Sequence, residues 1–227
     1  MYNKDLLITN ALPPLDTKLL DSIRKDYFAE RQEDCNDIDY NDFINNAVNH
    51  FKNNSHNILT GFDAFQHKDI IVGCQQYIDN LISKNGLSNL QIFEHDYDYY
   101  KKLDPNIKYV TVDTLQSGKP LLIALPFPGH LGVHKQMDEI LKVCNDKNID
   151  VHLDCAWMVS AFDINFNFDQ PCIKTFAMSF SKAYSLGWNK MGIRWSRTVD
   201  STDGITILNE SKNIPRTLMS VATYYMD

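Results

Sequence analysis

Two charged residues each follow an apolar run of the chain, and both are of types that can do chemistry there. Lys182 ends Ser179-Phe180-Ser181-Lys182, and Asp154 follows Val151-His152-Leu153. Burial lowers the pKa of an ammonium group and so makes a neutral amine available to attack a carbonyl carbon. A buried carboxylate can pair with a protonated pyridine nitrogen and strengthen that ring as an electron sink. Taken singly, each residue has an ordinary alternative, a surface lysine in a loop and an aspartate in a turn.

A second set of residues could hold a phosphate or a flat ring. Gly73, Cys74 and Gln75 open a helix-like segment directly after an apolar run, and the backbone N–H groups of such a turn can cradle a phosphate. Tyr97 lies in an aromatic-rich segment and could stack on a planar ring. Lys190, a little beyond Lys182, could meet a phosphate through its charge. The alternatives are an ordinary tight turn, a tyrosine of the core and a surface lysine.

These residues need a scaffold, and the hydrophobic pattern from residue 69 onward indicates one. Short β-rich runs alternate there with longer amphipathic stretches, notably Gln75–Ser83 and Val133–Cys144. Several runs are apolar throughout, as expected when helices cover both faces of a sheet. The predicted fold class is therefore α/β, a mainly parallel sheet sandwiched by helices. The expected strands are Ile70–Val72, Leu90–Glu94, Lys108–Val112, Leu121–Leu125, Val151–Leu153, Phe176–Phe180 and Gly192–Trp195.

In open sheets of this kind, ligands bind beyond the carboxyl ends of the strands and at helix N-termini. The candidate residues follow their runs directly, so we expect them to meet at one edge of the sheet. Residues 61–200 are predicted to form this main domain. Residues 1–60 read as an N-terminal extension that is partly irregular and partly helical, with helical spacing over residues 16–28 and 42–51. Residues 201–227 are interpreted as a tail or the start of a second, smaller domain.

Composition restricts the partners and the compartment. The net charge of -7 argues against a nucleic-acid partner, and no apolar stretch approaches the roughly 20 residues that a membrane helix needs. The N-terminus is polar and does not resemble a signal peptide. The five cysteines are scattered, which favours reduced thiols and the cytoplasm. His130 and His134 have no carboxylate partner at metal-binding spacing, so no metal site is expected.

The order of these motifs resembles the large domain of a fold-type I pyridoxal-phosphate enzyme of the aminotransferase class I/II family. The resemblance covers roughly residues 57–196, and its most specific part is the set Asp154, Lys182 and Gly192. It implies that Lys182 forms a Schiff base with pyridoxal 5'-phosphate and moves the α-proton of the substrate, while Asp154 pairs with the pyridine nitrogen. It further implies a homodimer that uses a small amino acid or amine as amino donor and a keto acid as acceptor.

The resemblance also assigns the remaining cofactor-binding residues. Tyr97 would stack on the ring, and Trp157 would lie near the ring oxygen, where the family has a tyrosine. The phosphate would be held by Gly73, Cys74, Gln75, Ser179, Ser181 and Lys190.

The sequence departs from the family at several positions. The proline-rich loop at residues 125–132 lacks the family's asparagine, and Lys190 stands in place of an arginine that binds phosphate in two-pronged fashion. Arg194 has the same strand parity as Lys190 and is a candidate to compensate. The sequence ends at Asp227, before the family's small C-terminal domain, as expected of a truncated, split or reduced relative.

Several functions therefore stay open. Transamination is the first hypothesis, but a lyase or decarboxylase of the same fold would use the same residues. A catalytically degenerate domain that binds a ligand or another chain is the alternative from a different class. An unrelated doubly wound protein that binds a phosphorylated ligand is the third, although the sequence has no glycine-rich nucleotide-binding fingerprint.

Overall fold

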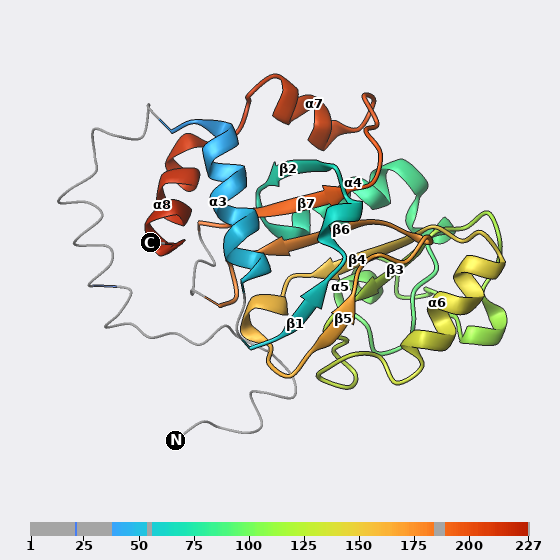
Figure 1. Ribbon diagram of the computed structural model, residues 1–227. Helices are drawn as coiled ribbons and strands as arrows, with labels where there is room; N and C mark the ends of the chain where they lie inside the picture. The colour runs from blue at the N-terminus through green and yellow to red at the C-terminus, as the bar shows by residue number, and fades with distance from the viewer. Residues whose placement is uncertain (1–20, 22–37, 54–55, 184–188, 227) are drawn as a thin grey trace.

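The computed structural model describes residues 21, 38–53, 56–183 and 189–226, which form a five-stranded sheet with helices on both faces (Figure 1). The strand order is β2-β7-β6-β4-β3. β6, β4 and β3 pair in parallel, whereas β7 pairs antiparallel with both β6 and β2, so four of the five strands point in one direction. The predicted α/β class with a mainly parallel sheet is thus confirmed. The strands are β2 (His67–Ile71), β3 (Leu121–Ala124), β4 (Val151–Cys155), β6 (Ile173–Ser179) and β7 (Gly192–Ser196).

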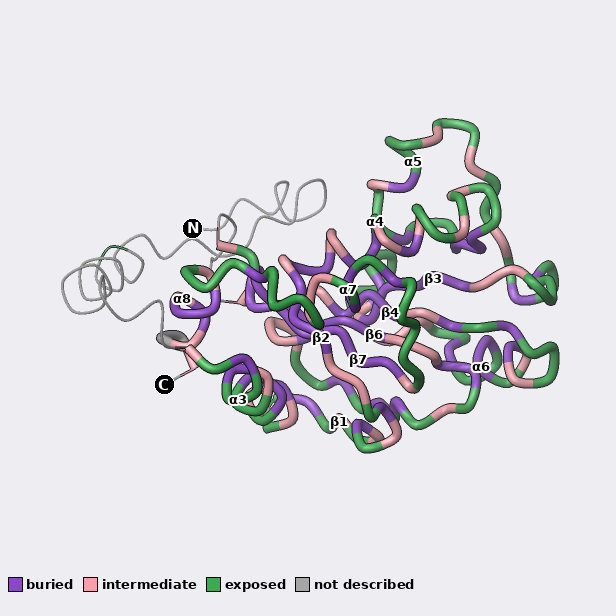
Figure 2. The backbone as a smooth tube through the Cα atoms, turned by 90° about the horizontal axis from the view of Figure 1, so that it is seen from above, coloured by how far each residue is buried: buried purple, intermediate pink, exposed green. Residues whose placement is uncertain are grey.

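Helices form a layer on each side of the buried strands, as Figure 2 shows. α4 (Gly73–Asn85) and α5 (Tyr99–Leu103) lie on one side, and α3 (Tyr40–Lys52) and α6 (Met137–Asp146) lie on the other. The amphipathic stretches predicted from sequence correspond to α4 and α6. Short 3-10 helices occur at Phe62–Ala64, Leu87–Asn89, Val112–Thr114 and Met158–Ser160.

The sheet separates two hydrophobic cores, and the alternation of side chains along β3 divides its residues between them. Leu121 and Ile123 join the larger core beneath α3 and α6, and Leu122 joins the smaller core beneath α4. Ala124 lies two residues beyond Leu122 and pairs with Asp154 of β4. Asp154 therefore projects toward the α4 side of the sheet.

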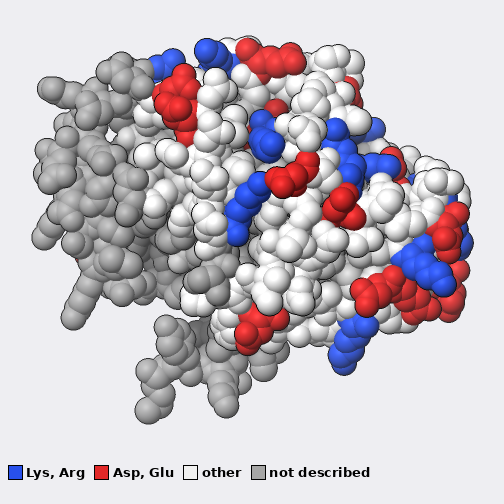
Figure 3. Space-filling view, viewed as in Figure 1, with Lys and Arg blue, Asp and Glu red and all other residues white. Residues whose placement is uncertain are grey.

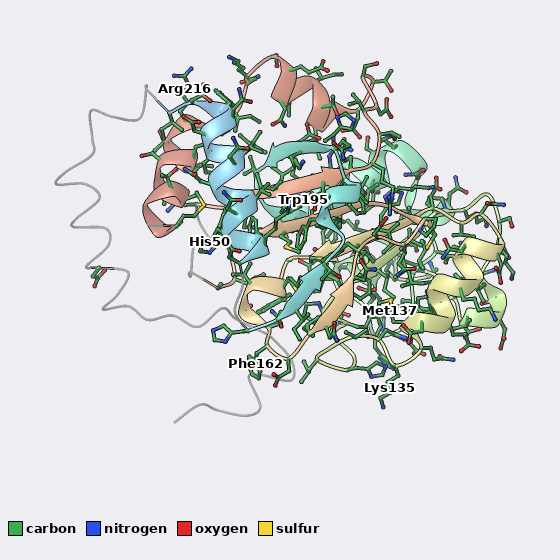
Figure 4. All side chains as sticks on the ribbon, in the orientation of Figure 1. His50, Lys135, Met137, Phe162, Trp195 and Arg216 are labelled. Atoms are coloured by element: carbon green, nitrogen blue, oxygen red, sulfur yellow. The ribbon has the colours of Figure 1, made fainter. Side chains whose placement is uncertain are left out.

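The larger core is rich in aromatic rings. Trp195 of β7, labelled in Figure 4, stacks on Phe176 of β6 with ring centroids 4.8 Å apart and an interplanar angle of 8°. Phe51 of α3 meets Trp195 edge-on at 5.6 Å. Burying aromatic rings of this size supplies much of the apolar area that holds α3 against the sheet.

The C-terminal residues form two helices that pack on this domain. α7 (Gly204–Glu210) begins at Asp203, whose carboxylate accepts hydrogen bonds from the N–H groups of Ile205 and Thr206. α8 (Arg216–Met226) lies beside α3 (Figure 1), and Tyr40 of α3 donates to the carbonyl of Lys212 just before α8. The division of the chain into three domains stays a proposal.

Two predicted strands are wrong as continuous strands. Leu90–Glu94 and Lys108–Val112 make only single parallel bridges, Gln91 with Leu121 and Phe93 with Val110. The physical reason is that side chains, in place of a neighbouring strand's backbone, form hydrogen bonds with the backbone groups in this region. The amide of Gln91 bonds the backbone of residues 116 and 119, and Asp96 accepts from the N–H of Ala124.

The sequence also gave no sign of a small second sheet, in which β1 (Ile58–Thr60) pairs in parallel with β5 (Asn165–Asn167). The helix expected over residues 42–51 corresponds to α3. The helix expected over residues 16–28 lies, apart from Asp21, outside the described residues.

No described helix combines the length and the apolar character that crossing a membrane would require. On the face shown in Figure 3, acidic and basic side chains are interspersed. Within the described residues no cluster of histidine, cysteine and carboxylate groups could hold a metal ion. The four described cysteines, Cys74, Cys144, Cys155 and Cys172, are buried free thiols.

Candidate functional site

One cavity of about 270 Å³ lies where β4 and β6 end and α4 begins. Ten residues that the sequence analysis assigned to the cofactor site line it, although they are spread over the chain from Gly73 to Lys190. These residues are Gly73, Cys74, Gln75, Tyr97, Asp154, Trp157, Ser179, Ser181, Lys182 and Lys190. The rest of the lining, which sequence reasoning missed, is Ile78, Ala124, Pro128 and Ala156. The site thus occupies the sheet edge where open α/β sheets bind ligands.

Lys182 follows β6 directly and is half-buried. Its Nζ lies 4.8 Å from the ring centroid of Trp157, within the range of a cation–π interaction. Burial lowers the pKa of Lys182, the charge of Lys190 lowers it further, and Asp154 and Cys74 oppose this shift. A lowered pKa increases the fraction of neutral amine, the form that attacks a carbonyl carbon.

Asp154 is buried near the end of β4, and its carboxylate accepts a hydrogen bond of 3.1 Å from the N–H of Ala156. Burial raises its pKa to about 6, while the contacts with Ala156 and Cys74 and the charge of Lys182 oppose this rise. A carboxylate that is buried in this way gains from a cationic partner, because the partner would offset its desolvation. A protonated ring nitrogen is such a partner.

The start of α4 forms a corner with the groups that an anion needs. Gly73 has a φ of +72°, and a Cβ at this position would lie 3.1 Å from Cβ of Lys190 and 3.5 Å from Oγ of Ser181. The Ser181 hydroxyl is buried and has no hydrogen-bond partner among the described residues. Buried hydroxyls are normally paired, so a free one beside a helix N-terminus and a lysine fits a bound phosphate.

Tyr97 borders the cavity with a partly exposed ring. Its hydroxyl lies 3.4 Å from Oε1 of Gln75, and its ring stacks on that of Tyr99 with centroids 5.7 Å apart. Its backbone N–H donates to the carboxylate of Asp96 at 2.6 Å. Sequence reasoning missed Asp96, since nothing local distinguishes it from the exposed aspartates nearby.

Arg194, which the sequence left as a candidate, does not take the place of the arginine that Lys190 replaces. Its guanidinium is buried and donates to Asp69 at 2.6 Å and to Asp203 at 2.6 Å. Arg194 thus belongs to an ion-pair network that joins β7, β2 and α7. Arg216, near α3 at the opposite side from α6 in Figure 4, lies over the ring of Tyr40 at 5.8 Å.

The departures from the family pattern persist in the cavity. Its described lining contains Pro128 from the proline-rich loop but no asparagine. Trp157 lines the cavity in the position where the resemblance expects a phenol, and its indole can only donate a hydrogen bond.

Comparison with solved structures places the fold in a class: it is the fold of the large domain of fold-type I pyridoxal-phosphate enzymes. In particular, the chain is similar to the aspartate aminotransferase of Plasmodium falciparum, with a TM-score of 0.62 and 13% identity over 94% of this chain and 63% of that one. The pyridoxal-phosphate-bound C-S lyase from Staphylococcus hominis gives a TM-score of 0.58 and 12% identity over 92% and 61%. L-threonine-O-3-phosphate decarboxylase from Porphyromonas gingivalis gives 0.51 and 12% over 70% and 55%.

The likeness to these three structures is one of fold. The chain spans between 55% and 63% of their lengths, and they are named for three different reactions. No family model matches the sequence, and no curated protein sequence matches it either.

Proposed function

We propose that this chain binds pyridoxal 5'-phosphate and acts as an aminotransferase on a small amino acid or amine. The observation that carries the proposal is the single cavity in which Lys182, Asp154 and the corner at Gly73 come together. Pyridoxal-phosphate-bound structures among the similar folds support the choice of cofactor.

The residues present fit this cofactor. When bound, it supplies an aldehyde carbon and a ring that withdraws electrons from the substrate. Lys182 would supply the amine that holds the aldehyde end of the cofactor and, as a free neutral amine, the base that takes the proton from the substrate Cα. Asp154 would hold the ring nitrogen in its protonated form.

The rest of the cavity would hold the cofactor in place. The N–H groups at the start of α4, which carries Gly73, Cys74 and Gln75, would bind the phosphate together with Ser179, Ser181 and Lys190. Tyr97 would cover one face of the ring, and Trp157 would contact its edge.

The specific reaction that we propose is transamination with a keto acid as acceptor. We expect the chain to act as a cytoplasmic homodimer. A lyase or decarboxylase would use the same Lys182 and Asp154. The similar folds include enzymes named for all three reactions.

The test is to trap the cofactor on the chain. The purified protein is mixed with pyridoxal phosphate, reduced with borohydride and digested, and the modified peptide is identified by mass. We expect one adduct, on Lys182, with loss of the yellow absorption in Lys182→Ala. Lys174→Ala is the matched control, because Lys174 lies on β6, the strand that precedes Lys182, its side chain is 44% exposed, and it does not line the cavity.

Transfer of the amino group from one of a panel of amino acids to an added keto acid, detected as the amino acid formed from that acceptor, would then establish transamination. A folded wild-type chain that gives no adduct would contradict the proposal, and the alternative of a catalytically degenerate binding domain would replace it. Release of ammonia without amino transfer to the acceptor would indicate a lyase, and release of carbon dioxide would indicate a decarboxylase.

A further inference from the structure

The edge of β3 next to the cavity has backbone N–H groups that no regular strand covers. Leu121 and Leu125 donate toward β4, to the carbonyls of Asp150 and Asp154. The backbone N–H groups of Leu122 and Ala124 point away from β4, because the N–H groups of successive residues in a strand point to opposite sides. Leu122 donates to the carbonyl of Gln91 at 3.1 Å, but the chain beyond Gln91 no longer runs as a strand beside β3.

The carboxylate of Asp96 takes the place of that strand at Ala124. Its Oδ2 accepts the N–H of Ala124 at 3.0 Å, and its Oδ1 accepts the N–H of Tyr97 at 2.6 Å. Both bonds are to a charged acceptor, and the side chain is buried. One carboxylate therefore ties two residues that line the cavity, Ala124 and Tyr97, to each other.

We propose that Asp96 is a positioning residue of the cofactor site: its ionised carboxylate fixes the backbone of Tyr97 against the end of β3 and so holds the Tyr97 ring over the cofactor. The inference rests on the proposed function and deepens it. The backbone just before Asp96 is constrained as well, since His95 has a φ of +68°. A side chain in the left-handed region is held there by its surroundings.

The described groups that face Asp96 are few. Asp154 at the end of β4 carries a charge of the same sign, and Tyr100 of α5 has a buried hydroxyl without a described partner. Burial is the main reason that the pKa of Asp96 is raised to about 7, and its hydrogen bonds from Tyr97 and Ala124 oppose the rise. The ionised carboxylate of Asp96, which accepts both hydrogen bonds strongly, is thus present above neutral pH and is lost as the pH falls.

The experiment compares wild type with Asp96→Asn, because asparagine has the shape of a protonated carboxyl group. The dissociation constant of pyridoxal phosphate is measured by absorbance at about pH 8.5 and about pH 5.5, on either side of the ionisation. We expect Asp96→Asn to raise the constant roughly tenfold at the higher pH, the effect of one charge-assisted hydrogen bond. At the lower pH the ratio of the dissociation constant of Asp96→Asn to that of wild type should fall toward about one.

Asp98→Asn is the matched control, because Asp98 is two residues away and its side chain is 76% exposed. It should change neither constant. A double-mutant cycle with Tyr97→Leu tests whether Asp96 acts through the ring: the effect of Asp96→Asn should shrink to less than about threefold in that background. Since Tyr97 is 41% exposed, this substitution should leave the fold intact.

Two results would overturn the inference while leaving the proposed function intact. One is a ratio of the Asp96→Asn constant to the wild-type constant that is the same at both pH values. That result would mean that the charge of Asp96 has no part in positioning Tyr97. The other is an undiminished effect of Asp96→Asn in the Tyr97→Leu background. If Asp96→Asn does not fold, Tyr97→Leu alone decides. The ratio of its dissociation constant to that of wild type should then be larger at the higher pH than at the lower pH. If the wild-type chain forms no adduct at Lys182, the proposed function fails and this inference with it.

Discussion

At the scale of single residues, two buried carboxyl groups have raised pKa values: Asp154, which lines the cavity, and Asp96, which binds two residues of the lining. Burial raises the pKa of Asp154 to about 6 and that of Asp96 to about 7, which brings both into the range of ordinary pH changes. Asp96 is bound by two N–H groups, whereas Asp154 accepts from Ala156 and faces the cavity. Buried carboxyl groups with shifted pKa values are typical of functional sites.

This raised pKa predicts how Asp154 affects stability. Because the folded-state pKa lies above the unfolded value, the folded protein binds more protons between about pH 4 and pH 6 than the unfolded chain does. The contribution of Asp154 to stability is therefore fully present at low pH and is lost as the pH rises through 6. We expect Asp154→Asn to stabilise the cofactor-free protein at about pH 7.5 by on the order of 2 kcal/mol, and by much less at about pH 4.5.

Thermal unfolding at the two pH values checks this prediction. Asp150→Asn is a suitable control, because Asp150 precedes the same strand and its side chain is 57% exposed. The same Asp154→Asn protein should bind pyridoxal phosphate more weakly. Destabilisation at neutral pH would show that Asp154 is stabilised by a partner rather than strained by burial.

At the scale of elements, a buried ion-pair network attaches α7 to the sheet. Arg194 of β7 donates to Asp69 of β2 and to Asp203, the residue that also caps α7. Thr206 of α7 accepts from the same guanidinium at 2.8 Å. Four of its five N–H donors are thus taken by Asp69, Asp203 and Thr206, and Arg194 does not line the cavity.

Loss of this arginine would remove the only ion pair described for the buried carboxylate of Asp69. It would leave Asp203 with Lys84, whose Nζ lies 3.3 Å from the Asp203 carboxylate. We expect Arg194→Met to destabilise the protein by about 3 to 5 kcal/mol, as breaking a buried pair from one side does. Lys174→Met on the neighbouring strand removes a mostly exposed pair and should change stability by less than about 1 kcal/mol. Denaturant unfolding of both variants checks the difference, and equal small losses would mean that Asp69 and Asp203 are hydrated once Arg194 is gone.

At the scale of the whole molecule, the cavity joins segments that lie far apart in the chain. α4, the ends of β4 and β6, and Lys190, two residues before β7, all contribute to its lining. A ligand that binds these segments together stabilises the folded state as a whole, by about 2.7 kcal/mol at a hundredfold excess over its dissociation constant.

Thermal unfolding with and without ligand tests this expectation. Pyridoxal phosphate should raise the melting temperature by roughly 5 to 10 °C, the shift expected for a chain of this size. Pyridoxal, which lacks the phosphate, should give a smaller shift. Lys190→Ala should reduce the effect of pyridoxal phosphate part of the way toward that of pyridoxal, because Ser179, Ser181 and the start of α4 remain, and should leave the pyridoxal shift unchanged. An equal loss with both ligands would place Lys190 elsewhere than at the phosphate.

The sequence by itself determined the fold class and ten of the described residues that line the cavity. Lys182 and Asp154 each follow an apolar run, and Gly73 follows another, so their places at strand ends can be read locally. Parallel strands bring such ends to one edge of a sheet, which is why a local pattern was sufficient. The resemblance to the fold-type I enzymes rests on the same order of motifs, and the structural comparisons confirm the fold.

Only the tertiary structure decided which charges are free and which are bound. Arg194 has the strand parity that a phosphate ligand would need, but its partner Asp69 is 125 residues away in the sequence, and no local pattern reveals that pairing. Asp96 looks like its exposed neighbour Asp98, and its role depends on the N–H of Ala124, which is 28 residues away. Alternation and apolar runs are properties of neighbouring residues, whereas the burial and pairing of a charge depend on contacts that exist only once the chain has folded.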